Sequence, residues 1–107
     1  MDTVNPLILG MIKSFGDKAT SDLFNGILSS KVRGLPTQIL ESATYKLDIL
    51  NAATSLNDLR SPPVNRLEAL RGEYKGFHSI RINSQWRIVF RWKDSNAHDV
   101  AIVDYHS

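Results

Sequence analysis

The last four residues of the chain, Asp104-Tyr105-His106-Ser107, carry the side chains best suited to move protons. They directly follow residues 100–103, an apolar run typical of a packed strand. The imidazole of His106 can donate or accept a proton near neutral pH. Tyr105 can accept a proton only if guanidinium groups lie nearby. Otherwise its ring stacks on a nucleobase or packs against the edge of the sheet. Asp104 can orient His106 or form a structural ion pair with an arginine.

Arginines upstream of this terminus could supply fixed positive charge. Arg81 and Arg87 fall on the polar face of an expected strand pair. A guanidinium binds phosphate through two hydrogen bonds and keeps its proton. Attack by a ribose 2′-hydroxyl on the adjacent phosphate builds charge on the non-bridging oxygens, which such cations stabilise. Acid/base groups beside fixed cations therefore favour cleavage of RNA. These arginines could instead pair with Glu68, Glu73 or Asp104.

The composition argues against metal and cofactor chemistry. There is no cysteine, which removes disulfides, thiolate catalysis and cysteine-ligated zinc and fits a reducing cytoplasm. The three histidines, His78, His98 and His106, lack the HxxxH and HExxH spacings of helical metal sites. No apolar run approaches the ~20 residues of a membrane span. We therefore expect a cytoplasmic protein with no cofactor, no metal and no membrane contact. We assign His78 and His98 to packing and to the protein surface rather than to chemistry.

The net charge of +2 is unevenly distributed along the chain. Residues 1–59 hold five basic and six acidic side chains, and residues 94–107 hold three acidic side chains without lysine or arginine. Residues 60–93 hold eight basic side chains against two acidic ones. This basic middle segment suits contact with a polyanion. A basic surface that is only solvated would give the same charge distribution.

With 107 residues the chain has room for a single core. We place one domain at residues 11–107, after an N-terminal extension of residues 1–10. Met11 could itself be a start residue, so the extension is either added sequence or a cap over the edge strand. These two readings stay open on the sequence.

Two helices are expected before the sheet. Residues 11–15 read as a short strand, and Asp17 is the expected N-cap of a short helix that ends at Leu28. Residues 36–53 form the longer helix, because a proline opens it and apolar residues recur at spacings of three and four. Residues 55–65 contain two prolines in a row and are expected to be loop.

After residue 65 the apolar period changes to two, as in strands with one buried face. We expect a hairpin with the loop Ser84-Gln85-Trp86, because a loop of even length would mix apolar and polar side chains on each face. The 36–53 helix should cover the apolar face and leave the arginines on the other. A turn at Asp94-Ser95-Asn96 leads to a last strand over residues 99–105. The expected cross-strand pairs are Ile80 with Phe90, Ile82 with Ile88, and Asn83 with Arg87.

With these residues assembled, the chain resembles the HigB-type toxins of toxin–antitoxin systems, within the RelE/ParE superfamily. The resemblance spans residues 11–106, and its motifs occur in order along the chain. It implies an α+β fold, with two N-terminal helices packed on a twisted, mostly antiparallel β-sheet. The residues that carry it are Met11-Ile12-Lys13-Ser14-Phe15, Leu59-Arg60-Ser61-Pro62-Pro63, Asn65-Arg66-Leu67-Glu68-Ala69-Leu70, Ser79-Ile80-Arg81-Ile82-Asn83, Gln85-Trp86-Arg87-Ile88 and Val103-Asp104-Tyr105-His106.

The resemblance also implies an activity and partners. It implies ribosome-dependent, metal-independent endonuclease cleavage of mRNA, which inhibits translation and arrests growth. The implied partners are the ribosome, its mRNA and a HigA-like helix-turn-helix antitoxin, through which alone the toxin would meet DNA.

The family motif assigns roles to individual side chains. The resemblance implies catalytic roles for Arg71, Arg87, Asp104, Tyr105 and His106. Glu68 stands where some relatives carry histidine, so its carboxylate could serve as an acid or base. Other relatives place lysine before the loop glycine where this chain has Arg71, which keeps the charge but holds its proton permanently. The residues expected to bind RNA are Arg66, Lys75, Arg81 and Asn83.

Two other functions stay open on the sequence. One is a ParE-like inhibitor of DNA gyrase, and the other is a non-catalytic RNA-binding module in which Arg81 and Arg87 hold phosphate. The Tyr105-His106 pair favours cleavage, because a protein that only binds has no need of an acid/base pair there.

Overall fold

A four-stranded antiparallel sheet, in the order β1-β2-β3-β4, forms the frame of the protein. The structure is a computed structural model that describes residues 11–105, and His106 and the extension at residues 1–10 lie outside the described residues. In this part of the chain no helix is long and apolar enough to cross a membrane. The strands are β1 (Glu68–Ala69), β2 (His78–Arg81), β3 (Trp86–Lys93) and β4 (Asn96–Asp104).

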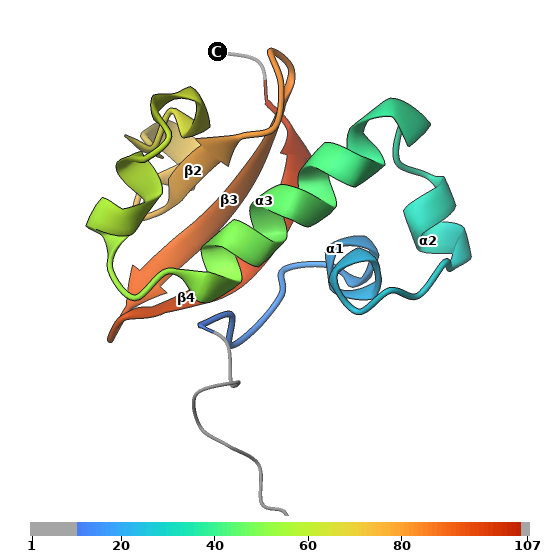
Figure 1. Cartoon of the computed structure of the whole chain (residues 1–107), viewed down its shortest axis with the longest axis horizontal. Helices are drawn as coiled ribbons and strands as arrows, with labels where there is room; N and C mark the ends of the chain where they lie inside the picture. The colour runs from blue at the N-terminus through green and yellow to red at the C-terminus, as the bar shows by residue number, and fades with distance from the viewer. Residues whose placement is uncertain (1–10, 106–107) are drawn as a thin grey trace, which may run out of the picture.

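Helices lie on one side of this sheet, and the longest of them runs across its face (Figure 1). They are α1 (Lys18–Phe24), α2 (Ser30–Arg33) and α3 (Leu40–Ala52), the last preceded by a 3₁₀ turn, η2 (Thr37–Ile39). The α+β architecture is confirmed, but the expected two helices are three, because α2 occupies part of the stretch assigned to linker. Asp17 is the N-cap of α1, as predicted, and its side chain accepts from the Thr20 N–H at 2.8 Å.

The first helix ends four residues earlier than predicted, at Phe24 rather than Leu28. Gly26 follows with φ +75, a left-handed conformation that ends helices and that glycine adopts without strain. Pro36 is the N-cap of η2, so the long helix begins with a 3₁₀ turn rather than with an α-helical one.

The core lies between α3 and the sheet, as expected. Successive turns of α3 bury Ala43, Leu47 and Leu50 completely. They pack against apolar side chains of the central strands, which are also fully buried. This packing fixes which face of the sheet is left for polar chemistry. The strand residues in the core are Ile80, Ile88, Phe90, Ala97, Val100 and Ile102.

The segment predicted to be loop, residues 55–65, instead forms two 3₁₀ helices, η3 (Leu56–Arg60) and η4 (Pro63–Asn65). Ser55 and Asp58 form a capping box at the start of η3. Pro63 stands in the first turn of η4, where a missing backbone N–H costs no hydrogen bond. The proline rule excluded long helices correctly, but it does not exclude short 3₁₀ turns.

The β2–β3 hairpin has the predicted odd loop length and a different register. Arg81 pairs with Arg87, Ile80 with Ile88, and His78 with Phe90. The loop is Asn83-Ser84-Gln85, one residue earlier than expected, and the Ile82 N–H donates to the Trp86 carbonyl at 2.9 Å. The Asn83 side chain sets this turn, because its Oδ1 accepts from the Gln85 and Trp86 N–H groups, both at 2.8 Å. A shift of two residues preserves the two faces.

The β3–β4 hairpin turns at Asp94 and Ser95, whose φ values of +52 and +63 suit a tight two-residue loop. Strand β4 begins at Asn96, three residues before the prediction, and ends at Asp104. Residues 11–15 form no regular strand; instead Ile12 and Phe15 make isolated parallel bridges to Ala97 and Val100. Gly16 permits this close approach, since an added Cβ would lie 3.1 Å from the Asp99 carbonyl oxygen.

Candidate active site

Arg87 is the centre of the candidate site, on the sheet face opposite α3. Its side chain is only 13% exposed. Nη1 donates to the Ser79 hydroxyl at 2.7 Å and to the Arg66 carbonyl at 3.3 Å. Nη2 lies 2.7 Å from the Glu68 carboxylate, and the guanidinium carbon lies 5.6 Å from the centre of the Tyr105 ring. Contacts from four segments therefore fix one cation in place.

A polar hollow of about 330 Å³ opens in front of Arg87. Three guanidinium groups and a single carboxylate line it, which leaves an excess of positive charge. Its size lies in the range of small-ligand sites, and its charge suits an anion. The structure thus brings four predicted site residues together with Arg87 here. The lining residues are Arg66, Glu68, Arg81, Ser84, Arg87 and Tyr105.

A second hollow, of about 470 Å³, is also lined by Tyr105. It is lined by Tyr105, Arg71, Asp104 and the short 3₁₀ helix η5 (Gly72–Tyr74). The Tyr74 and Tyr105 rings stand 6.2 Å apart and are tilted by 54°. Tyr105 lines both hollows, so Arg87 of one hollow and Arg71 of the other both lie near this residue.

The backbone at Arg66 has an unusual conformation. Arg66 has φ +46, a left-handed conformation that is uncommon for a non-glycine residue. The residue before it, Asn65, is fully buried and donates to the Leu59 and Ser61 carbonyls at 3.3 and 3.4 Å. Asn65 Oδ1 also accepts from Lys46 Nζ of α3. This buried anchor holds Arg66 where its carbonyl meets Arg87.

The end of β4 is tied to the β2–β3 loop. Asp104 pairs with Trp86 in the sheet, and its Oδ2 accepts from the Gln85 side-chain amide at 3.1 Å. The Tyr105 N–H donates to the Gln85 carbonyl at 2.8 Å. These bonds bring Tyr105 to the arginine face, as predicted, although the predicted neighbour His106 lies outside the described residues.

Two of the residues expected to bind RNA do not line the hollow in front of Arg87. Asn83 uses its side-chain oxygen to shape the hairpin loop, and its carbonyl accepts from Arg81 Nε at 3.0 Å. Lys75 follows η5 and lines neither of the two hollows. The sequence reasoning missed Lys46, Asn65 and Ser79, which are buried behind the site.

The histidine of β2 belongs to the packing, as expected. His78 stacks on Phe90 with ring centres 6.2 Å apart, and its Nδ1 is buried without a hydrogen bond. Burial lowers the pKa of His78, and the positive charge of Arg60 lowers it further. Among residues 11–105 no cluster of three or more histidine or acidic side chains could hold a metal ion.

The fold is similar to that of the YoeB proteins of Staphylococcus aureus. The YoeB dimer of Staphylococcus aureus superposes with a TM-score of 0.53, at 16% identity over 91% of this chain and 99% of that chain. The YoeB-YefM complex from the same organism gives a TM-score of 0.51, at 16% identity over 90% of this chain and 98% of that chain.

The family follows from the sequence comparisons. The family described as "RelE-like toxin of type II toxin-antitoxin system HigB" matches residues 13–106. "Toxin HigB-1" of Vibrio cholerae serotype O1 is 40% identical over 87 residues, which are 81% of this chain and 90% of that protein. "Endoribonuclease HigB" of Proteus vulgaris is 31% identical over 96 residues, 90% of this chain and all of that protein. The chain belongs to the HigB-like toxin family, whose members are paired with antitoxins.

Proposed function

We propose that the chain is a metal-independent, ribosome-dependent endoribonuclease that cleaves mRNA and so inhibits translation. One observation supports this most: Arg87 is held by Ser79, Arg66 and Glu68 at the back of a cationic hollow beside Tyr105. The Proteus vulgaris relative carries the name endoribonuclease. The protein would act in the cytoplasm, where ribosomes are, and a HigA-like helix-turn-helix protein would be its antitoxin.

The arginines would bind the scissile phosphate. Arg87, Arg66 and Arg81 face the same hollow, so their charges can meet the negative charge that develops on the non-bridging oxygens. The 2′-oxygen attacks phosphorus and loses its proton, while the 5′-oxygen of the next nucleotide leaves and gains one. A 2′,3′-cyclic phosphate and a 5′-hydroxyl end are the products. The chemistry needs one group to accept a proton and one to donate it.

Glu68 and Tyr105 line the same hollow as these arginines, and His106 follows directly in the sequence. The Glu68 carboxylate is the natural acceptor, because phosphate binding at Arg87 would displace it from the guanidinium and free its oxygens. Tyr105 or His106 would then protonate the leaving oxygen. The Tyr74 and Tyr105 rings offer a stacking surface for a base, and Arg71 stands beside it to hold a neighbouring phosphate.

The test compares Arg87→Ala with Arg91→Ala in ribosome complexes that carry a defined message. Both arginines lie on β3, but Arg91 stacks over Phe77, pairs with Asp99 and lines neither hollow. Loss of a transition-state cation typically lowers the rate by about a hundredfold, or ~3 kcal/mol. We expect that loss for Arg87→Ala alone, measured by mapping new 5′ ends.

Tyr105→Phe and His106→Gln, in the same assay, should abolish cleavage and leave ribosome co-sedimentation nearly unchanged. Joint loss of cleavage and binding would mean that these residues bind rather than transfer protons. Growth arrest with intact messages and altered DNA supercoiling would instead support the gyrase alternative. Arrest with neither change would support the RNA-binding module.

A further inference from the structure

A buried lysine of the long helix reaches the turn that precedes Arg66. Lys46 of α3 is 7% exposed, and its Nζ donates to the side-chain oxygen of Asn65, which is fully buried in η4. Burial of an ammonium group is costly, and a neutral amide carries no charge to offset that cost. An aliphatic side chain would avoid it. The lysine therefore points to a role beyond packing.

Arg66 needs support because its backbone conformation is strained. Its φ of +46 lies in the left-handed region, where Cβ crowds the following carbonyl. Three other non-glycine residues between positions 11 and 105 have positive φ, and all of them, Asp94, Ser95 and Asp99, have short polar side chains. A long side chain that its surroundings hold in this conformation is a mark of functional sites.

The hydrogen bonds that hold Arg66 come from η4 and its buried amide. The Asn65 N–H donates to the Pro62 carbonyl at 2.9 Å, and the Arg66 N–H donates to the Pro63 carbonyl at 3.0 Å. The Asn65 side chain joins this turn to two carbonyls of the preceding segment, at 3.3 and 3.4 Å, and to Lys46. The position of the Arg66 peptide thus depends on a contact with α3.

Arg66 contributes to the arginine hollow in two ways. Its carbonyl accepts from Arg87 Nη1 at 3.3 Å, and its side chain lines the hollow. The segment between η4 and the edge strand β1 carries it there from the helical side of the sheet. A rotation of this one peptide would move the carbonyl that holds Arg87 and would also move a second guanidinium.

We propose that Lys46 and Asn65 are positioning residues, which fix the Arg66 peptide and through it the Arg87 guanidinium at the scissile phosphate. Neither side chain touches the substrate. The inference rests on the proposed endonuclease function and adds to it a rate-determining contact between α3 and the arginine hollow.

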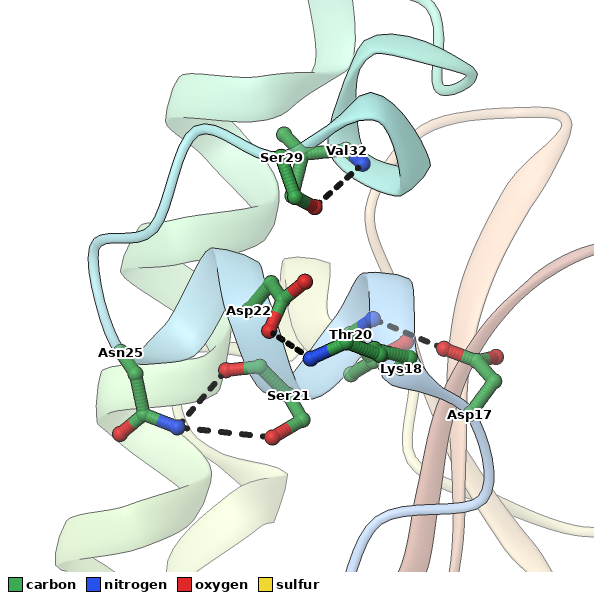
Figure 2. A network of polar contacts seen from close by, with 8 residues as sticks. All are labelled: Asp17, Lys18, Thr20, Ser21, Asp22, Asn25, Ser29 and Val32. Atoms are coloured by element: carbon green, nitrogen blue, oxygen red, sulfur yellow. Dashed lines mark hydrogen bonds and ion pairs between the residues drawn. The ribbon is translucent and has the colours of Figure 1, made fainter.

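A second buried polar network, in the helices, provides a matched control (Figure 2). Asp22 of α1 is 2% exposed and pairs with Lys18 at 3.0 Å, and Ser29 accepts from the Val32 N–H at 3.3 Å at the start of α2. None of these four residues lines either hollow. Asp22→Asn should therefore destabilise the fold without moving Arg87.

The first measurement is single-turnover cleavage of a message in ribosome complexes, at a temperature where circular dichroism shows every variant folded. Lys46→Met keeps the aliphatic stem and loses the donor. A misplacement on the order of 1 Å can lower a rate by about a hundredfold, so we expect a loss of at least about tenfold at saturating toxin. The half-saturating toxin concentration should change little, because ribosome affinity sums many phosphate contacts. Asp22→Asn should keep the wild-type rate.

A double-mutant cycle tests whether the effect passes through Arg66. Glycine adopts the left-handed conformation without strain, so a glycine at this position needs the anchor less. Lys46→Met should then slow Arg66→Gly several-fold less than it slows the wild type. A loss that came only from lower stability would be the same in both backgrounds.

The second measurement is the NMR signal of the Arg87 Nε–H, assigned by its absence from Arg87→Ala. Lys46→Met should shift it, as should Ser79→Ala, which removes the other partner of Nη1. Asp22→Asn should leave it in place. If Lys46→Met does not fold, Asn65→Asp replaces it in every measurement, because it keeps the acceptor for Lys46 and loses both side-chain N–H donors.

Several results would overturn the inference. It fails if folded Lys46→Met cleaves at the wild-type rate, or if Asp22→Asn slows cleavage as much. It also fails if cleavage slows while the Arg87 signal stays in place, or if both backgrounds at position 66 lose equally. A wild type that cleaves no message, with an Arg87 signal that still shifts in Lys46→Met, would refute the proposed endonuclease and leave the structural coupling intact.

Discussion

Replacement of Asn65 by leucine should be among the most destabilising single changes in the described chain. Asn65 is fully buried and joins its own turn, η4, to α3 and η3, because it bonds Lys46 of α3, the Leu59 carbonyl of η3 and the carbonyl of the next residue but one, Ser61. Leucine has the same branched skeleton, with more bulk, but makes none of these bonds. Asn65→Leu therefore removes the polar partners while it keeps the branching of the side chain.

The magnitude follows from the groups left without partners. A buried polar group that loses its only partner costs about 1–3 kcal/mol, and more if it is charged. Two carbonyls and one ammonium are affected. Burial lowers the pKa of Lys46, so the fold already disfavours its charged form, and the variant also removes the Asn65 oxygen that accepts from it. We expect a loss of about 3–5 kcal/mol, a large share of a typical domain's stability.

The assay is urea unfolding of Asn65→Leu, Lys46→Met and the double variant. Each single change should strand the other partner, so the double variant should be about 1–3 kcal/mol more stable than the sum of the single losses. Asn25→Leu is the control, because its hydrogen bonds to Ser21 are exposed and its loss should stay within ~0.5 kcal/mol. Additive losses, or a loss below ~1 kcal/mol for Asn65→Leu, would refute the reasoning.

Two more outcomes are expected. Hydrogen bonds from Ser29 and Lys18 hold the pKa of the buried Asp22 carboxyl below its ordinary value, so the charged carboxylate stabilises the fold above the unfolded-state pKa, and this stabilisation is lost as pH falls through the folded-state pKa. Acid should therefore lower the urea midpoint of the wild type more than that of Asp22→Asn. Equal acid sensitivity of the two proteins would contradict this. Arg66→Gln should reduce the slope of log ribosome affinity against log salt by about one, whereas Arg33→Gln, on the helical side in α2, should leave the slope alone.

The sequence predicted the two faces of the sheet and missed the register of its central hairpin. Alternation of apolar and polar residues determines which side chains share a face, and it is unchanged when a strand slips by two residues. The choice between such registers depends on the turn. Asn83 settles it here by accepting two backbone N–H groups, a local bond that hydrophobic alternation does not reveal.

The candidate site was predictable to the extent that its side chains are charged and lie at strand ends. Arg81, Arg87 and Tyr105 meet in one hollow because strand pairing brings them to the same face. The alternative that an arginine pairs with Glu68 also holds, for Arg87. Lys46 and Asn65 were not found, because a buried lysine bonded to a neutral amide has no sequence signature. Lys46 and Asn65 meet only because the tertiary fold packs α3 against η4.

The environment of Arg87 explains how one side chain can be held firmly and still exchange partners. Glu68 is 53% exposed, and an ion pair with so exposed a carboxylate contributes at most ~1 kcal/mol. The bonds to the Ser79 hydroxyl and the Arg66 carbonyl use Nη1, whereas Glu68 takes Nη2. A phosphate can therefore replace Glu68 at small cost while Nη1 stays anchored. In the proposed endonuclease, the displaced carboxylate would stay in the hollow that it lines and could accept a proton there.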